Sequence, residues 1–81
     1  MPLKNQFVSF CTERGMRATE RRLAVVDVIA RFEGPFSAED VMASSAEQHL
    51  TVGLATTYRT LQILEAMEKL ARDDRRYRPL P

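Results

Sequence analysis

The 81-residue sequence has little of what enzymes and metalloproteins need. It contains one cysteine (Cys11), one histidine (His49) and three dispersed glycines. A single cysteine cannot form an internal disulfide, and one histidine without a second cysteine gives no metal-ligand spacing. There is no recognisable nucleophile and base pair, and no glycine-rich loop that would cradle a phosphate. The sequence therefore predicts no enzyme, no small-molecule substrate, and neither catalytic nor metal-binding residues.

Long apolar runs are missing as well. No uninterrupted stretch is long enough to cross a bilayer, and the first six residues lack the apolar core of a signal peptide. These features predict no membrane partner and a cytoplasmic protein. The composition, 44% hydrophobic and 28% charged, is that of an ordinary globular protein, and the length allows one small domain.

The net charge of +1 conceals an uneven distribution along the chain. Residues 1–32 hold six basic and three acidic side chains, residues 33–68 hold one and six, and residues 69–81 hold five and two. If the two basic ends fold to the same side, they form a surface that binds phosphates while the acidic middle points away. Scattered, solvated charge is the alternative interpretation.

Apolar periodicity predicts four helices, at residues 3–14, 20–32, 37–48 and 53–67. Gly15 is expected to end the first helix, and Thr19 to cap the second. Ser37 and Asp40 have the spacing of a capping box at the start of the third. Gly53 is an acceptable N-cap for the fourth.

The fourth helix has two different sides. Leu54, Thr57, Leu61 and Leu64 fall on the side expected to be buried. Ala55, Thr56, Arg59 and Gln62 fall on the other, with Tyr58 at the boundary. Small residues allow close approach to a duplex, a guanidinium grips guanine edges, and an aromatic ring packs on thymine methyls. The pattern predicts a DNA-recognition helix whose base contacts come from Ala55, Thr56, Tyr58 and Arg59. An ordinary amphipathic surface helix is the alternative.

Three arginines stand around the start of the second helix. Arg17 lies in the preceding loop, and Arg21 and Arg22 lie in the first turn, where a cation opposes the helix dipole. A DNA phosphate would compensate this charge, and the carboxylates of Glu20 and Asp40 are local alternatives. We therefore expect these arginines to contact phosphates or a minor groove.

The last basic segment predicts a β-hairpin. Residues 69–72 and 75–78 alternate apolar and basic side chains across Asp73-Asp74. Leu70 and Tyr77 are expected to close over the helices. Arg72, Arg75 and Arg76, together with Gln62 of the fourth helix, are expected to contact phosphates or a minor groove. A frayed basic tail is the alternative, and residues 79–81 are expected to form a hinge or tail.

Four motifs together resemble the ferric uptake regulator family. They are the segments at residues 15–22, 36–41, 52–61 and 76–78, which read GMRATERR, FSAEDV, VGLATTYRTL and RYR. The resemblance implies a mainly α fold with a small β-hairpin, a winged helix-turn-helix of about four helices followed by a two-stranded antiparallel wing. It also implies a metal-homeostasis repressor that binds AT-rich palindromic operators as a homodimer. Tyr58 and Arg59 match the family's base-contacting pair, and Arg17 matches a residue that reaches the adjacent minor groove.

The sequence also departs from the family pattern. Family members carry a second domain for dimerisation and metal sensing, so iron or zinc would bind a C-terminal domain that residues 1–81 do not include. Gly34-Pro35-Phe36 stands where many members have a metal-binding His. Residues 66–69 lack the family's glycine, which predicts either a longer fourth helix or a wing at an unusual angle.

These observations predict one winged-helix domain over residues 1–81 that acts as the sequence-specific DNA-binding part of a transcriptional regulator. The alternative is a winged-helix module for protein-protein contact, or a truncated regulator without operator binding.

Overall fold

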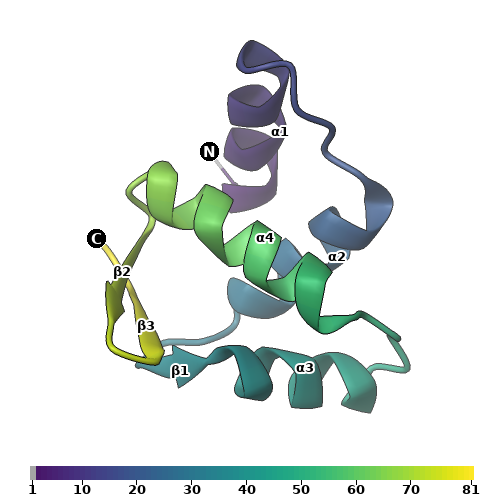
Figure 1. The fold of residues 1–81 in the computed structure, drawn as a ribbon, viewed down its shortest axis with the longest axis vertical. Helices are drawn as coiled ribbons and strands as arrows, with labels where there is room; N and C mark the ends of the chain where they lie inside the picture. Colours follow the sequence, from purple (N-terminus) through teal and green to yellow (C-terminus); the bar gives the residue numbers. More distant parts are fainter. Residues whose placement is uncertain (1) are drawn as a thin grey trace.

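A computed structural model describes residues 2–81 as four helices followed by strands of one small sheet (Figure 1). The helices are α1 (Leu3–Glu13), α2 (Glu20–Ile29), α3 (Ala38–Glu47) and α4 (Leu54–Ala66), and the strands are β1 (Phe36–Ser37), β2 (Leu70–Asp73) and β3 (Arg76–Pro79). Figure 1 shows α4 across the middle of the fold, with α1 and α3 on opposite sides of it. Because α4 packs against α2, α3 and β2, it is the element around which the domain is built.

The helix starts follow the predicted caps. Oγ1 of Thr19 accepts a hydrogen bond from the backbone N–H of Arg22, at 3.2 Å. Oγ of Ser37 accepts from the N–H of Asp40 at 3.1 Å, and Oδ2 of Asp40 accepts from the N–H of Ser37 at 2.9 Å. Both halves of the capping box are therefore formed, and α3 begins where the sequence predicts.

Three helices end in the same kind of turn, in which one residue takes a positive φ. These residues are Gly15 (68°), His49 (62°) and Glu68 (60°). In each turn the next N–H reaches back to a carbonyl five residues earlier, as in the 3.0 Å bond from Lys69 to Leu64. The fourth helix therefore does not continue past this turn, although the sequence has no glycine there. It ends at Ala66, because Glu68 adopts the left-handed conformation itself.

The prediction that the second helix extends to residue 32 was wrong. α2 ends at Ile29, and the N–H groups of Arg31 and Phe32 bond to carbonyls only three residues back, at 3.1 Å each. This tightening turns the chain so that the ring of Phe32 stacks on Phe36, with centroids 4.7 Å apart. Tertiary stacking thus overrides a helical pattern that continues past Ile29.

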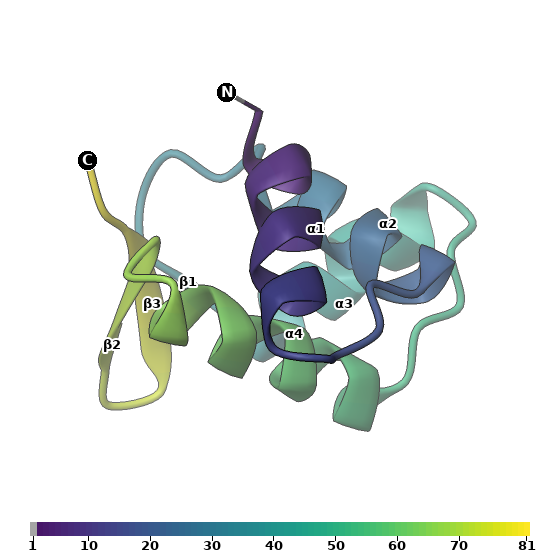
Figure 2. The same cartoon turned by 90° about the horizontal axis from the view of Figure 1, so that it is seen from above.

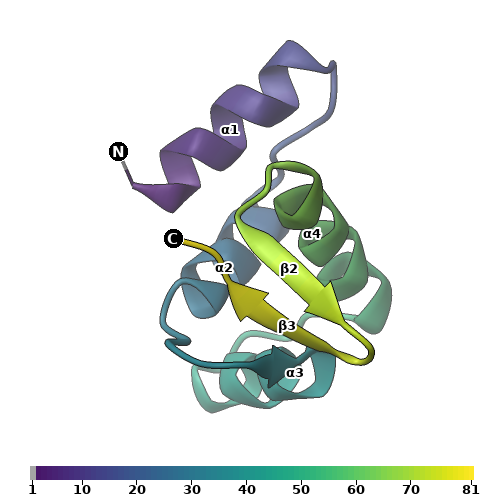
Figure 3. The same cartoon turned by 90° about the vertical axis from the view of Figure 1, so that its left-hand side faces the viewer.

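The wing is larger than predicted and shifted by one residue. β1 adds a third strand, and the antiparallel order is β1-β3-β2 (Figure 3). The connecting turn is Asp74-Arg75 rather than Asp73-Asp74, because Asp73 pairs with Arg76 and Asp74 takes a φ of 60°. Pairing continues to the C-terminal end, since Pro79 closes β3 and the N–H of Leu80 donates to Lys69 O at 3.0 Å.

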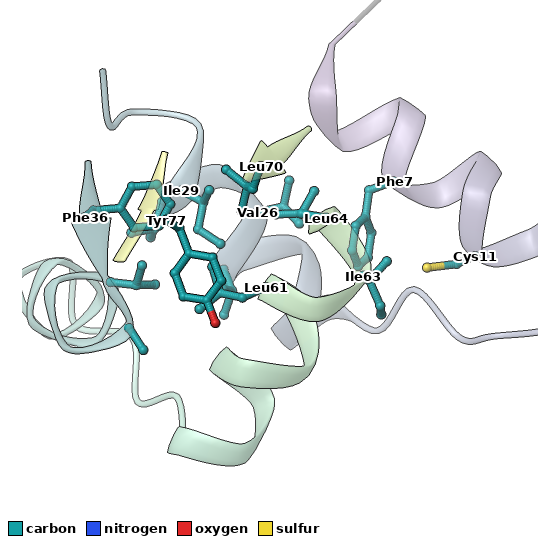
Figure 4. Close-up of a cluster of buried hydrophobic side chains, with 14 residues drawn as sticks. Phe7, Cys11, Val26, Ile29, Phe36, Leu61, Ile63, Leu64, Leu70 and Tyr77 are labelled. Atoms are coloured by element: carbon teal, nitrogen blue, oxygen red, sulfur yellow. The ribbon is translucent and has the colours of Figure 1, made fainter. Parts of the chain in front are cut away.

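The core is one apolar cluster that joins every helix to the sheet. Its fully buried members include Phe7, Val26, Phe36, Leu61 and Leu64. Leu70 and Tyr77 are 4% and 3% exposed, so both close over the helices as expected (Figure 4). Each packs from a different strand, and this anchors the wing to the helical body.

Cys11 is a buried core residue without a disulfide. Burial raises the pKa of its thiol, and the positive charge of Arg22 opposes that shift only in part. The thiol therefore stays protonated and unreactive at neutral pH.

None of the helices described over residues 2–81 combines the length and the apolar character that crossing a membrane would require.

Candidate nucleic-acid interface

The outward side of α4 presents most of the predicted base-contacting residues together. Ala55, Arg59 and Gln62 are exposed, and the side chain of Tyr58 is 39% exposed beside them. Thr56 is half-buried at the edge of the same face. The side chains predicted to read DNA therefore lie along one accessible surface of the helix.

The prediction that Leu54 is buried was wrong. Its side chain is 50% exposed, whereas Thr57, Thr60, Leu61 and Leu64 are fully buried. A residue with the right periodicity in the first turn of α4 therefore still meets solvent. Leu54 consequently adds an apolar side chain to the accessible start of the helix.

Two threonines are buried on the inner side of α4, and the hydroxyl of each has a hydrogen-bond partner. Oγ1 of Thr57 donates to the carbonyl of Gly53 at 3.0 Å, and Oγ1 of Thr60 donates to the carbonyl of Thr56 at 2.8 Å. Each hydroxyl is thus satisfied by the preceding turn of its own helix. The inner side of α4 can therefore be buried while its polar outer side stays accessible.

A first hollow lies where the start of α2 meets the first turn of α4; we call it the α2 hollow. Its lining includes Arg17, Arg21 and Arg22 from the α2 side and Thr56 from α4. Nη1 of Arg22 donates to the backbone carbonyl of Arg17 at 2.8 Å, which ties the loop to the helix. The structure thus brings all three predicted arginines of this region beside α4.

A second hollow, the wing hollow, lies between α4 and the wing. It is lined by Glu39, Tyr58, Arg72, Asp74, Arg75 and Tyr77. Nε of Arg72 donates to the carbonyl of Asp74 at 3.1 Å, which fixes that side chain across the turn of the wing. Two of the three predicted wing arginines, Arg72 and Arg75, therefore lie beside Tyr58. Arg76 and Gln62 are exposed and line neither hollow.

Both hollows border the first half of α4, the α2 hollow at Thr56 and the wing hollow at Tyr58. Figure 2 shows the start of α2 beside the first turn of α4 and the sheet beside its other end. Every polar side chain predicted for the interface therefore lies on α4 or on an element next to it.

The interface arginines have no acidic partners within residues 2–81. In that range the one ion pair within 4.0 Å joins Lys4 and Asp27, over 3.1 Å, and both of these side chains are nearly half exposed. Asp40, a local candidate to pair with the α2 arginines, caps α3 instead. Glu20 lines the α2 hollow without forming an ion pair there. The guanidinium groups thus remain available to an external anion.

Sequence reasoning missed three residues of the wing hollow, Glu39, Asp74 and Tyr77. Asp74 was expected only as part of the turn. Tyr77 was expected only as a core residue, although a buried tyrosine usually needs a partner for its hydroxyl. Glu39 carries no local signal, because the capping box that places it concerns its neighbours Ser37 and Asp40. It reaches the wing hollow only through the packing of α3 beside α4 and β1.

Four helices, the last bearing an accessible polar face, followed by an antiparallel wing define a winged helix-turn-helix domain. The model of the ferric uptake regulator family matches residues 13–76 of this chain. The chain therefore belongs to the ferric uptake regulator family.

Individual relatives agree with this assignment. The chain is 33% identical over 64 residues to the ferric uptake regulation protein of Rhizobium leguminosarum bv. viciae. The matched residues make up 79% of this chain and 45% of that protein. Its fold matches a zinc uptake regulator complexed with zinc and DNA, with a TM-score of 0.75, 25% identity and coverage of 96% of this chain and 53% of that one.

A further solved structure, the ferric uptake regulator of Pseudomonas aeruginosa with manganese, gives a TM-score of 0.75 at 28% identity, covering 98% of this chain and 60% of that one. The chain spans about half the length of the relatives it matches. The family and these relatives are regulators rather than enzymes.

Proposed function

We propose that this chain is the sequence-specific DNA-binding domain of a transcriptional repressor of the ferric uptake regulator type. The observation that carries the proposal is the position of α4, whose accessible face lies between two hollows that contain arginines without acidic partners. A protein that reads DNA needs base-reading side chains on a helix that fits the major groove, with cations on either side for the phosphates. The accessible face of α4 and the arginines on either side of it support this role.

In the proposed complex α4 enters the major groove. Arg59 grips guanine edges through its two-pronged guanidinium, and the ring of Tyr58 packs on thymine methyls. Ala55 and Thr56 in the first turn allow the helix to approach the base edges closely. Exposed Leu54 lies at the same end and adds an apolar contact.

The flanking arginines hold the duplex without reading its sequence. Arg17, Arg21 and Arg22 contact phosphates or the minor groove from the α2 side, and Arg72, Arg75 and Arg76 do so from the wing, with Gln62 between them. These contacts release condensed counterions, so they strengthen binding to any duplex and weaken as salt rises. The net charge of +1 does not oppose this role, because the cations are gathered where the duplex would lie.

By the same proposal the operator is an AT-rich palindrome occupied by two copies of the protein. A single module binds weakly, since the linked second half-site of a dimer raises the effective concentration by about a hundredfold or more. The residues present do not fit a resident iron or zinc ion, because no three His, Cys, Asp or Glu side chains within residues 2–81 form a metal-binding group. A metal response would therefore depend on residues outside this stretch, and no step of the proposal requires one.

The test begins with selection of preferred sequences from a pool of random duplexes, followed by fluorescence anisotropy titrations at increasing salt. We expect an enriched AT-rich half-site and a steep loss of affinity with salt. Arg76→Ala should reduce the salt slope by about one unit. Arg31→Ala is the matched control, since it removes the same charge at the opposite end of α2 from the α2 hollow. No duplex binding, or binding indifferent to salt, would refute the proposal and favour a protein-contact module.

A further inference from the structure

The hydroxyl of Tyr77 belongs to a buried side chain and is unpartnered within the described residues. Its side chain is 3% exposed, and its ring stacks on Phe36 with centroids 6.1 Å apart. Within residues 2–81 the hydroxyl has no hydrogen-bond partner. Every fully buried side-chain oxygen in that range does have a partner, so the Tyr77 oxygen itself must reach solvent. The oxygen therefore lies where the core opens into the wing hollow, which Tyr77 lines. Figure 4 shows it pointing away from Phe36 and Leu70.

The groups around this hydroxyl suit a phosphate. Arg72 lies directly opposite Tyr77 in the sheet, and its bond to the Asp74 carbonyl uses Nε, so both terminal nitrogens remain available. Arg75 and Tyr58 complete the donor side of the wing hollow. Burial raises the pKa of the Tyr77 phenol, an effect that Arg72 only partly opposes. The hydroxyl consequently keeps its proton and can donate at neutral pH.

We propose that Tyr77 is a further DNA-contacting residue, whose hydroxyl donates a hydrogen bond to one backbone phosphate of duplex DNA held between Arg72 and Arg75 in the wing hollow. The inference rests on the proposed function and adds a residue and a position to it. Hydroxyl and guanidinium donors are typical partners of DNA phosphates. Because the Tyr77 ring is fixed in the core, this bond sets the height of the DNA backbone relative to α4, which the longer, exposed side chains of Arg72 and Arg75 do less well.

Two carboxylates in the wing hollow decide what kind of phosphate it accepts. Glu39 and Asp74 balance the charges of Arg72 and Arg75, so the hollow has no net formal charge before an anion enters. Charge alone therefore does not attract a free anion. A phosphate that the rest of the duplex delivers can still make the hydrogen bonds, and Glu39 then lowers affinity by repelling it.

The first experiment uses Tyr77→Phe, which removes the oxygen and keeps the buried ring. With the selected duplex, anisotropy titration should show affinity about ten- to a hundredfold weaker, as expected for a lost hydrogen bond to a charged group. The urea midpoint should not fall, because the hydroxyl has no partner within the fold. Replacing single phosphates of the duplex by neutral methylphosphonates should reveal one position at which wild type and variant bind equally.

The outcomes separate this inference from the function on which it rests. Wild-type protein that binds no duplex refutes the proposed function. Duplex binding that Tyr77→Phe leaves unchanged, or a deficit that persists at every methylphosphonate position, refutes only the role of Tyr77.

A second variant tests the carboxylate. Glu39→Gln should strengthen duplex binding by about threefold to tenfold, because it removes a repulsion close to the phosphate. Glu47→Gln is the matched control, since it makes the same charge change on an exposed residue at the other end of α3. Equal effects of the two variants would contradict the placement of a phosphate beside Glu39.

Inorganic phosphate distinguishes the source of the bound group. Added at constant ionic strength, it should leave the melting temperature of wild type unchanged. A stabilisation by inorganic phosphate that Tyr77→Phe abolishes would show a free-anion site and overturn the assignment to the DNA backbone.

Discussion

The guanidinium of Arg22 donates a hydrogen bond from Nη1 to the backbone carbonyl of Arg17, over 2.8 Å. The backbone N–H of Arg22 also donates to Oγ1 of Thr19, at 3.2 Å. Arg22 is thus joined by its side chain and its backbone to the loop before α2, and this loop carries Arg17 beside Thr56. A residue expected to contact a phosphate therefore also shapes the loop that presents a second arginine.

This relationship predicts non-additive effects on DNA binding. Arg22→Ala should weaken binding by about fivefold to tenfold in the wild-type background, because the loop loses the bond that holds Arg17 in place. In an Arg17→Ala background the same change should cost much less. Anisotropy titrations of the two single variants and the double variant measure this coupling. Additive losses would show that the bond from Arg22 does not position Arg17, so that each arginine acts only through its own contact.

Arg59 is expected to carry most of the discrimination between bases. Arg59→Ala should weaken binding to the preferred duplex by about 1 to 3 kcal/mol, because a bidentate contact to a base edge is lost. Binding to an unrelated duplex should weaken far less, so the ratio of the two affinities falls. Competition titrations with both duplexes provide the measurement. An equal loss on both would reassign Arg59 to the DNA backbone.

Cys11 provides a test of the fold itself. Because the thiol is fully buried and burial raises its pKa, alkylation by iodoacetamide at neutral pH should be very slow in the folded protein. The rate should rise in step with unfolding as urea is added. Because the pKa of the thiol is higher in the folded state, its contribution to the free energy of unfolding is fully present below the unfolded-state pKa. That contribution is lost as the pH rises through the folded-state pKa. Rapid alkylation without urea would show that α1 is not packed as described.

Local chemistry in the sequence was sufficient to place the helix starts. Thr19, Ser37 and Asp40 act through hydrogen bonds to backbone groups three residues away, and such bonds form whatever the rest of the chain does. The apolar period of α4 likewise identified Thr57, Leu61 and Leu64 as buried. The accessible face of α4 could be predicted for the same reason.

Features that depend on distant segments were predicted poorly. β1 has two residues, and only its pairing with β3 makes it a strand. Leu54 fits the apolar period, yet half of its side chain stays exposed. Glu39 and Tyr77 share the wing hollow because α3, α4 and the wing meet there. Tertiary packing decides which strand pairs with β1, how far Leu54 is covered and which residues share the wing hollow. A periodic pattern in the sequence carries no information about such packing.

The turn after α4 predicts a stabilising substitution. Glu68 holds a φ of 60°, a conformation that costs a residue with a Cβ atom about 1 to 2 kcal/mol relative to glycine. Part of that gain is offset because glycine loses more backbone freedom on folding. Glu68→Gly should therefore raise the free energy of unfolding, by about 1 kcal/mol.

Glu68→Ala is the control that separates backbone from charge. Both substitutions remove a carboxylate near the C-terminal end of α4, where a negative charge is unfavourable, but alanine retains the Cβ atom. The glycine variant should therefore be the more stable of the two in urea denaturation. Histidine tolerates the left-handed region better than most residues, so His49→Gly at the end of α3 should gain less than Glu68→Gly. If the glycine and alanine variants at position 68 unfold at the same urea concentration, the positive φ at Glu68 carries no measurable strain.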